Sequence, residues 1–215
     1  MIPRIVHRIW LGGDVPRVAR RFGESWERHC PGWEVRTWRD WDLPPLINQR
    51  AFDEVTHPSQ GADLARLELL WRFGGVYVDT DFEALRPIET LLDGVNCFLA
   101  SEDRKFVGTA IMGSRPGHPF IGRLVERASA SIAAHPGEPP NRQTGPFFVT
   151  AQLKAYQRTN GQRDGVVIFP AELFYPYHYS EPERRYDEFP DAVAVHHWSG
   201  SWVGTWSGGD ETTTS

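Results

Sequence analysis

Apolar and polar residues alternate over the first positions of the chain, and the pattern changes soon afterwards. The alternation at 2–10 predicts a strand that ends at Gly12-Gly13. A helix is expected at 17–29, because Pro31-Gly32 then breaks the chain, and the alternating letters WEVRTW predict a second strand. Strand, helix and strand in this order indicate an α/β fold.

Leucines at helical spacing predict a further helix, which leads into an acidic pair. This helix is expected to begin near Asp63, after a polar and proline-rich stretch at 43–59, and to end at Gly74-Gly75. The letters VYV then indicate a buried strand that runs directly into Asp79-Thr80-Asp81. Further strands are expected at 95–100, 109–113, 166–169 and 193–195, helices at 120–134 and 146–156, and a loop at 174–189.

The bulk composition indicates one globular domain. Of the 215 residues, 40% are hydrophobic and 24% are charged, which is enough apolar material for one sizeable core. We therefore expect a single domain over 1–205, with a mixed sheet flanked by helices. Residues 206–215 are mostly polar, so a disordered tail is expected there.

The net charge, the N-terminal segment and the cysteines limit which partners and which cellular compartment we expect. The net charge of -5 and the absence of any long run of Lys and Arg argue against a nucleic-acid partner. Basic residues interrupt the apolar N-terminal run, which is typical of neither a signal peptide nor an integral membrane segment. We expect a cytoplasmic protein, with a peripheral position at the inner face of the membrane left open, and buried thiols at Cys30 and Cys97.

The acidic pair is the clearest candidate for chemistry. Two carboxylates at Asp79 and Asp81 point the same way if the strand continues through them, and two such like charges need a cation. Mg²⁺ and Mn²⁺ prefer these hard oxygen ligands and in turn bind a diphosphate. A D-x-D alone is more often a solvated loop end. Its delivery by an apolar strand to the edge where α/β sheets bind ligands favours a functional site.

Asp63 and Arg66 form a second polar pair, placed at the first turn of the predicted helix and beside its positive end. The pair suits polar recognition of a ligand. Spacing alone favours the simpler alternative, a surface ion pair of little energetic value.

The stretch ADLARLELLWRFGGVYVDTD resembles the sugar-binding D-x-D region of glycosyltransferase family 32. It is also similar to the catalytic domain of the large clostridial glucosylating toxins. Four more blocks resemble the family in the same order, namely IPRIVHRIWLGG, GSRPGHPF, QTGPFFVT and VHHWSGSW, so that the resemblance reaches from Ile2 to Trp202. It implies a single-domain, GT-A-type, Rossmann-like fold.

The resemblance also implies roles for particular residues. Asp81 matches the main metal ligand, Asp79 matches the aspartate that contacts the ribose and assists the metal, and His196 matches a C-terminal metal ligand, with His197 as the alternative. Further residues match positions that bind the donor in the family. Tyr77 matches a position that faces the nucleotide, and Asp63 and Arg66 match the pair that grips the sugar and the diphosphate. Trp10 matches an aromatic residue that stacks on the base, and Ser201 and Trp202 match a segment that covers the donor. A core position for Trp10 is nearly as plausible, and we interpret His7 as structural.

The implied activity is a retaining, metal-dependent transfer of a sugar, with Mn²⁺ or Mg²⁺ as cofactor and Asp79, Asp81 and Arg66 as the catalytic set. A UDP-sugar is the favoured donor and GDP-mannose the alternative. The acceptor is a glycan, as in polysaccharide biosynthesis, or a protein. No carboxylate stands out as a covalent nucleophile, which favours attack on the same face of the sugar.

Three alternatives remain open. An aspartate-nucleophile phosphohydrolase also places an Asp-x-Asp after an apolar strand, but that class has Thr or Val where Glu83 stands. A non-catalytic carbohydrate-binding module would explain the nine Trp residues but needs no acidic pair. A toxin-like protein glycosyltransferase would have the same donor site.

Overall fold

The computed structural model describes residues 1–103, 105–160 and 165–199. Its strands are β1 (Ile5–Ile9), β2 (Glu34–Trp38), β3 (Gly75–Val78), β4 (Phe82–Ala84), β5 (Cys97–Ser101), β6 (Val107–Ser114), β7 (Val167–Phe169) and β8 (Ala194–His196). Its helices are α1 (Arg17–His29), α2 (Gln49–Glu54), α3 (Pro58–Phe73), α4 (Pro119–Ala134), α5 (Pro140–Gln143) and α6 (Pro146–Asn160), with short 3₁₀-helices η1 (Ile88–Leu91), η2 (Ala171–Leu173) and η3 (Pro182–Tyr186).

A mixed sheet of six strands forms the centre of the molecule, in the order β2-β1-β3-β6-β5-β7. Strand β1 lies parallel to both β2 and β3, whereas β6 runs antiparallel to β3 and to β5. The carboxyl ends of β1 and β3 therefore meet at one edge of the sheet. A separate antiparallel ribbon pairs β4 with β8.

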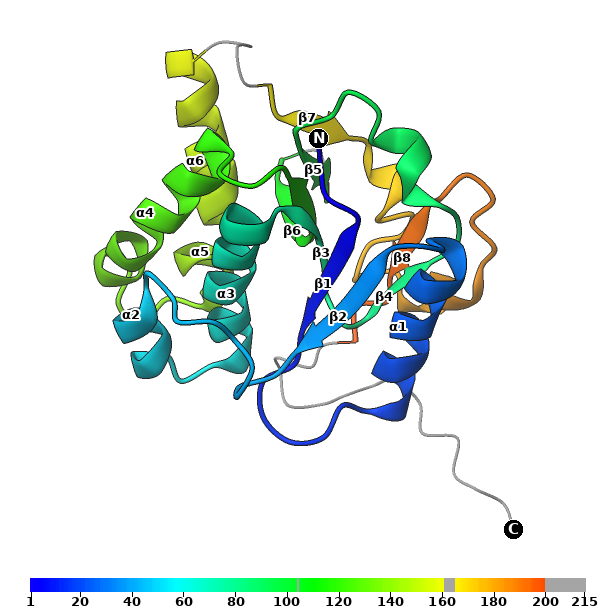
Figure 1. Ribbon diagram of the computed structural model, residues 1–215, viewed down its shortest axis with the longest axis horizontal. Helices are drawn as coiled ribbons and strands as arrows, with labels where there is room; N and C mark the ends of the chain where they lie inside the picture. Colours follow the sequence, from blue (N-terminus) through cyan, green and yellow to red (C-terminus); the bar gives the residue numbers. More distant parts are fainter. Residues whose placement is uncertain (104, 161–164, 200–215) are drawn as a thin grey trace.

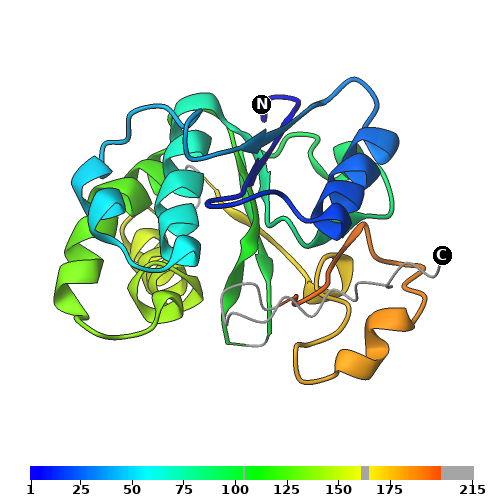
Figure 2. The same ribbon diagram turned by 90° about the horizontal axis from the view of Figure 1, so that it is seen from below.

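Helices cover both faces of the six-stranded sheet (Figure 1). Helices α2 to α6 lie on one face, and α1 lies on the other with the β4–β8 ribbon, as the view from below shows (Figure 2). The side chains of β3 alternate between the two cores. Tyr77 packs in the core on the α3 side, whereas Val76 and Val78 pack in the core that contains Trp26 of α1. The expected α/β mixed sheet flanked by helices is confirmed.

Most predicted elements are present close to their expected positions. Helix α1 covers 17–29 as predicted, and β1, β2, β5, β6, β7, β8, α4 and α6 overlap the segments expected for them. Cys30 and Cys97 are free and buried, which confirms the expectation of buried thiols. No helix within the described ranges combines the length and the apolar character needed to cross a lipid bilayer. The predicted tail at 206–215 lies outside the described residues.

The start of α3 differs from the prediction. The helix begins at Pro58 and not near Asp63, because a proline in the first turn presets the backbone dihedral and needs no hydrogen-bond partner for its nitrogen. Asp63 and Arg66 therefore lie inside the helix, and the prediction that they sit in its first turn beside the positive end is wrong. The polar, proline-rich segment at 43–59, for which no helix was predicted, contains the six-residue helix α2.

Two more segments differ from expectation. The strand that carries the acidic pair does not continue through it: β3 ends at Val78, a turn follows, and β4 begins at Phe82. The segment at 174–189 was expected to be a loop, but residues 182–186 form the 3₁₀-helix η3. Pro182 opens η3, where its fixed dihedral suits a helical turn.

Candidate metal centre at the carboxyl end of β3

A tight turn between β3 and β4 presents the acidic pair. The backbone N–H of Asp79 donates to the carbonyl of Ala110 on β6 at 2.8 Å, which continues the pairing of β3 by one residue. The N–H of Phe82 then donates to the carbonyl of Asp79 at 3.0 Å. The first bond fixes the start of the turn to the six-stranded sheet, and the second closes the turn on itself. A turn, and not the continuous strand considered in the prediction, brings the two carboxylates close together.

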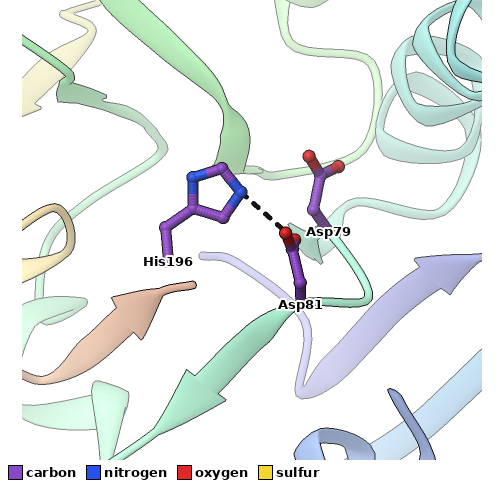
Figure 3. Close-up of side chains that lie close together, drawn as sticks. All are labelled: Asp79, Asp81 and His196. Carbon is purple, nitrogen blue, oxygen red and sulfur yellow. Dashed lines mark hydrogen bonds and ion pairs between the residues drawn. The ribbon is translucent and has the colours of Figure 1, made fainter. Parts of the chain in front are cut away.

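His196 reaches the same point from near the end of the described chain. Strand β8 pairs with β4 so that His196 lies opposite Phe82, and their rings stack with centroids 5.2 Å apart. The Nε2 atom of His196 lies 3.1 Å from Oδ1 of Asp81 (Figure 3). The backbone N–H of Ser199 donates to the other carboxylate oxygen of Asp81 at 2.8 Å. Strand pairing across more than a hundred residues thus brings the imidazole to the acidic turn.

Asp79, Asp81 and His196 form a group of side chains that suits a divalent cation. Each offers one ligand atom, and these atoms all lie within 4.8 Å of one another. Two carboxylate oxygens and one imidazole nitrogen are ligands that Mn²⁺ accepts, and Mg²⁺ shares the preference for oxygen. Asp81 and His196 are only 8% and 7% exposed, so the turn does not point into bulk water. The residues present therefore fit the cation that the sequence analysis expects.

The electrostatics of this group follow from the pairing of His196 with Asp81. Burial raises the pKa of Asp81, but the charge and hydrogen bond of His196 together with the bonds from Ser199 lower it well below its usual range. Burial lowers the pKa of His196, and Asp81 more than offsets this, so that the pKa is raised. A cation that takes the place of the imidazole proton would leave Asp81 ionised and make His196 neutral.

Arg66 joins the acidic turn to helix α3. Its Nη2 atom lies 3.0 Å from Oδ1 of Asp63 and 3.2 Å from Oδ1 of Asp79. Its guanidinium lies over the ring of Tyr77, 4.5 Å from the centroid, and Nη1 donates to the carbonyl of Thr109. The hydroxyl of Tyr77 donates to Oδ1 of Asp79 at 2.6 Å. One guanidinium therefore orders the three side chains that the resemblance assigns to the donor.

The pair of Asp63 and Arg66 is buried and not on the surface. The two residues are 6% and 5% exposed, so the alternative of a surface ion pair is wrong. Burial raises the pKa of Asp63 to about 6, although Arg66 and a hydrogen bond from the hydroxyl of Thr144 at 2.7 Å lower it. Burial lowers the pKa of Arg66 in turn, but Tyr77, Asp79 and Asp63 outweigh it, so that the guanidinium stays charged.

The remaining expected residues divide into three cases. Trp10 follows β1 and is half-buried, with its backbone N–H donating to the carbonyl of Trp38 at 2.9 Å. His197 turns toward Glu83, at 2.8 Å, and stacks on Phe22, so the geometry favours His196 over His197 as a ligand of the cation. Ser201 and Trp202, both expected to cover the donor, lie outside the described residues.

Glu102 is a further carboxyl group near the centre that the sequence reasoning missed. It follows β5 and is half-buried, and its backbone N–H donates to the carbonyl of Phe106 at 3.0 Å across the β5–β6 hairpin. Burial raises the pKa of Glu102 and the charge of His196 lowers it, with a further increase from Asp79. The sequence signal was its place just after a predicted strand, at the same edge as the acidic pair.

Comparison with known proteins finds a family model that is similar to part of this chain. Residues 16–98, which include the acidic pair, match the family described as a glycosyltransferase sugar-binding region containing a DXD motif. The chain is 25% identical over 215 residues to inositol phosphoceramide mannosyltransferase 1 of Schizosaccharomyces pombe, covering 95% of this chain and 63% of that protein. It is 29% identical over 164 residues to an alpha-1,4-N-acetylglucosaminyltransferase of Homo sapiens, covering 71% of this chain and 46% of the human protein.

The fold is also similar to that of a glycosyltransferase domain of known structure. The crystal structure of the UDP-bound glycosyltransferase domain of the YGT toxin superposes with a TM-score of 0.57, covering 78% of this chain and 79% of that domain at 10% identity. At that identity the likeness concerns the fold alone. Residues 16–98 thus resemble the DXD-containing sugar-binding region of glycosyltransferases, and the fold is of the GT-A type.

Proposed function

We propose that this protein transfers a sugar from a nucleotide diphosphate to an acceptor hydroxyl, with a divalent cation held by Asp79, Asp81 and His196. The observation that carries the proposal is the convergence of these side chains from two distant segments, with one ligand atom of each within 4.8 Å of the others. A carbohydrate-binding module has no need of this arrangement. Its position in a matched DXD region supports the same conclusion.

The donor is a nucleotide sugar, and a UDP-sugar is the first candidate. A neighbour of the same fold has UDP bound, which supports uridine, and GDP-mannose is the alternative. The relatives are named for the transfer of different sugars, mannose and N-acetylglucosamine, so the names support the class of donor and not one sugar. The chain spans 63% and 46% of the lengths of these two relatives. The acceptor of this protein is proposed only as a hydroxyl group of a glycan or a protein.

The bond that breaks joins the anomeric carbon of the sugar to an oxygen of the diphosphate, and negative charge grows on that oxygen as the sugar becomes oxocarbenium-like. A bound Mn²⁺ or Mg²⁺ supplies a Lewis acid for that charge. Asp79, Asp81 and His196 would hold it, and Arg66 adds a fixed positive group that is already oriented by Asp63 and Thr109. Because these groups are ordered before the donor binds, little reorganisation is needed as the charge develops.

Asp63 would orient the donor on the α3 side of the centre, and Tyr77 would contribute through Asp79, to which its hydroxyl donates. The ionised carboxylate of Asp63 accepts a hydrogen bond from Thr144 and pairs with Arg66, which leaves it suited to accept hydrogen bonds from sugar hydroxyls as well. We propose retention of anomeric configuration by attack on the same face. Glu102 is the carboxyl group to test as a second contributor, because its pKa responds to the charges of both His196 and Asp79.

The decisive variant is Asp81→Asn, which keeps the size of the side chain but removes its charge. We expect UDP release from UDP-sugars in the presence of Mn²⁺ to fall at least about a hundredfold, as removal of a principal metal ligand and its electrostatic role implies. Release is measured without an acceptor, so that donor hydrolysis reports on the donor site alone, and GDP-mannose is assayed in parallel.

Asp93→Asn is the matched control, since Asp93 is exposed and lies in the turn before β5. It should retain the wild-type rate. Full activity of the Asp81→Asn variant with excess Mn²⁺ would refute the assignment of Asp81. Release of inorganic phosphate from simple phosphomonoesters by the wild-type protein would favour a phosphohydrolase instead.

A further inference from the structure

Arg8 on β1 is a buried cation that the proposed mechanism does not use. It is 2% exposed, and no carboxylate of the described residues lies within ion-pair distance of its guanidinium. Burial lowers the pKa of Arg8 to about 10, partly offset by Tyr77, Asp81 and Glu27, so it remains charged at neutral pH. Burying a charge without an ionic partner costs folding free energy, so a structural or functional role is expected for this side chain.

The partners of Arg8 are backbone carbonyls, and one of them belongs to the acidic turn. Its Nη2 atom donates to the carbonyl of Thr80 at 3.0 Å and also to the carbonyl of Ala19 in α1, while Nη1 donates to the hydroxyl of Thr37 on β2 at 3.2 Å. Thr80 is the residue between Asp79 and Asp81. One side chain therefore ties the middle of the turn to β2 and to α1.

Helix α1 leaves room for this guanidinium at one position. Gly23 is buried in α1, and a Cβ atom built there would lie 2.2 Å from Nη1 of Arg8 and 3.1 Å from its Cζ. Such a distance is not tolerated, so any larger residue at 23 must displace the end of the arginine. Glycine is otherwise unfavourable inside a helix by about 1 kcal/mol relative to alanine. Its presence here is explained by the space that Arg8 needs.

We propose that Arg8 is a positioning residue that holds the Thr80 carbonyl, and with it the spacing of the Asp79 and Asp81 carboxylates, and that Gly23 is required for it to do so. The planar fork of arginine can donate to several acceptors at once, which a lysine cannot match. Its effect on cation affinity rests on the proposed function, whereas its effect on the turn does not.

The test is Gly23→Ala, because it displaces Arg8 without removing it and favours the helix. We expect the Mn²⁺ concentration for half-maximal UDP release to rise about tenfold or more, as is typical when a group that orients metal ligands is disturbed. The melting temperature should change little, since the added helix propensity offsets the displaced contact. Arg8→Lys should shift the Mn²⁺ requirement in the same direction.

Gly122→Ala is the matched control: the change is also from glycine to alanine inside a helix, α4, and its Cβ would meet Trp71 at 3.0 Å and not the acidic turn. It should leave the Mn²⁺ requirement unchanged. An unchanged requirement in both Gly23→Ala and Arg8→Lys would overturn the proposal.

Hydrogen exchange gives a readout that is independent of activity. In the absence of metal, the amide of Phe82, which closes the turn, should exchange at least about tenfold faster in Gly23→Ala than in the wild type, because the turn has lost its anchor. Equal exchange rates would refute the positioning role even if the wild-type protein proved to have no glycosyltransferase activity. Absence of Mn²⁺-dependent activity in the wild type would count against the proposed function alone.

Discussion

The imidazole of His7 on β1 is fully buried and has a single compatible protonation state. Its Nδ1 atom accepts the indole N–H of Trp38 at 3.0 Å, so Nε2 carries the proton and donates to the carbonyl of Gly74 at 2.9 Å. A second proton on Nδ1 would face the indole N–H with no acceptor. Burial accordingly lowers the pKa of His7 to about 4, with Arg36 acting in the same direction and the bond to Gly74 against it.

This pairing predicts how stability depends on pH. The pKa of His7 in the folded protein is below its usual 6.5, so its contribution is present above that pH and is lost as the pH falls toward about 4. Over that range His7 should account for a loss of about 2 to 3 kcal/mol in the free energy of unfolding. The difference in this free energy between wild type and His7→Gln, measured by urea titration, should therefore shrink by about that amount between pH 7 and about pH 4.5.

His135→Gln is the control for this prediction, since His135 is exposed. It should change the free energy of unfolding by the same small amount at both pH values. A wild-type advantage over His7→Gln that stays constant with pH would show that His7 is not held neutral by its neighbours.

At the scale of elements, the site depends on how α3 turns into β3. Gly74 ends α3 with φ of 65° and ψ of -156°, a backbone conformation that is open to glycine and strained for other residues. A Cβ atom at Gly74 would lie 2.6 Å from Cδ of Pro116 and 2.8 Å from Cδ of Pro3. The turn is therefore constrained by dihedral and by space together, and the direction of β3 follows from it.

Gly74→Ala should destabilise the protein by more than about 2 kcal/mol, because strain at positive φ adds to overlap with two proline rings. The free energy of unfolding in urea measures this directly. Gly94→Ala separates the backbone strain from the steric overlap, since Gly94 has φ of 70° but nothing within 4 Å of its Cβ position. It should cost only about 1 kcal/mol. Equal costs at the two positions would contradict the role assigned to crowding around Gly74.

Elements that are bounded by proline or glycine residues were predictable from the sequence. Helix α1 was placed correctly because Pro31-Gly32 follows a clear helical segment, and β3 because an apolar run follows two glycines. The start of α3 was not predicted correctly. Pro58 belongs to a proline-rich stretch in the sequence, but in the structure it is the first residue of the helix. Strand β4 was missed since three residues after an acidic turn carry too little periodicity to indicate a strand.

At the scale of the whole molecule, the centre is assembled from parts that are far apart in the sequence. His196 comes to Asp81 because β8 pairs with β4, and Asp63 comes to the same region because α3 packs on the sheet beside β3. Local patterns could indicate Asp79 and Asp81 but not the histidine, since nothing in a short window reports pairing over a hundred residues. Only the resemblance to a family suggested His196. The burial of Arg66 between two carboxylates could likewise not be predicted from the sequence, because it depends on the fold.

Binding of UDP with and without Mn²⁺ to the wild-type protein, measured by isothermal titration calorimetry, tests the central claim most directly. We expect binding that requires Mn²⁺, is abolished by EDTA and is at least about a hundredfold weaker in His196→Ala, because the imidazole completes the group that holds the cation. His197→Ala should bind as the wild type does, since His197 pairs with Glu83. UDP binding of equal strength with and without Mn²⁺, or unchanged binding in His196→Ala, would contradict the account.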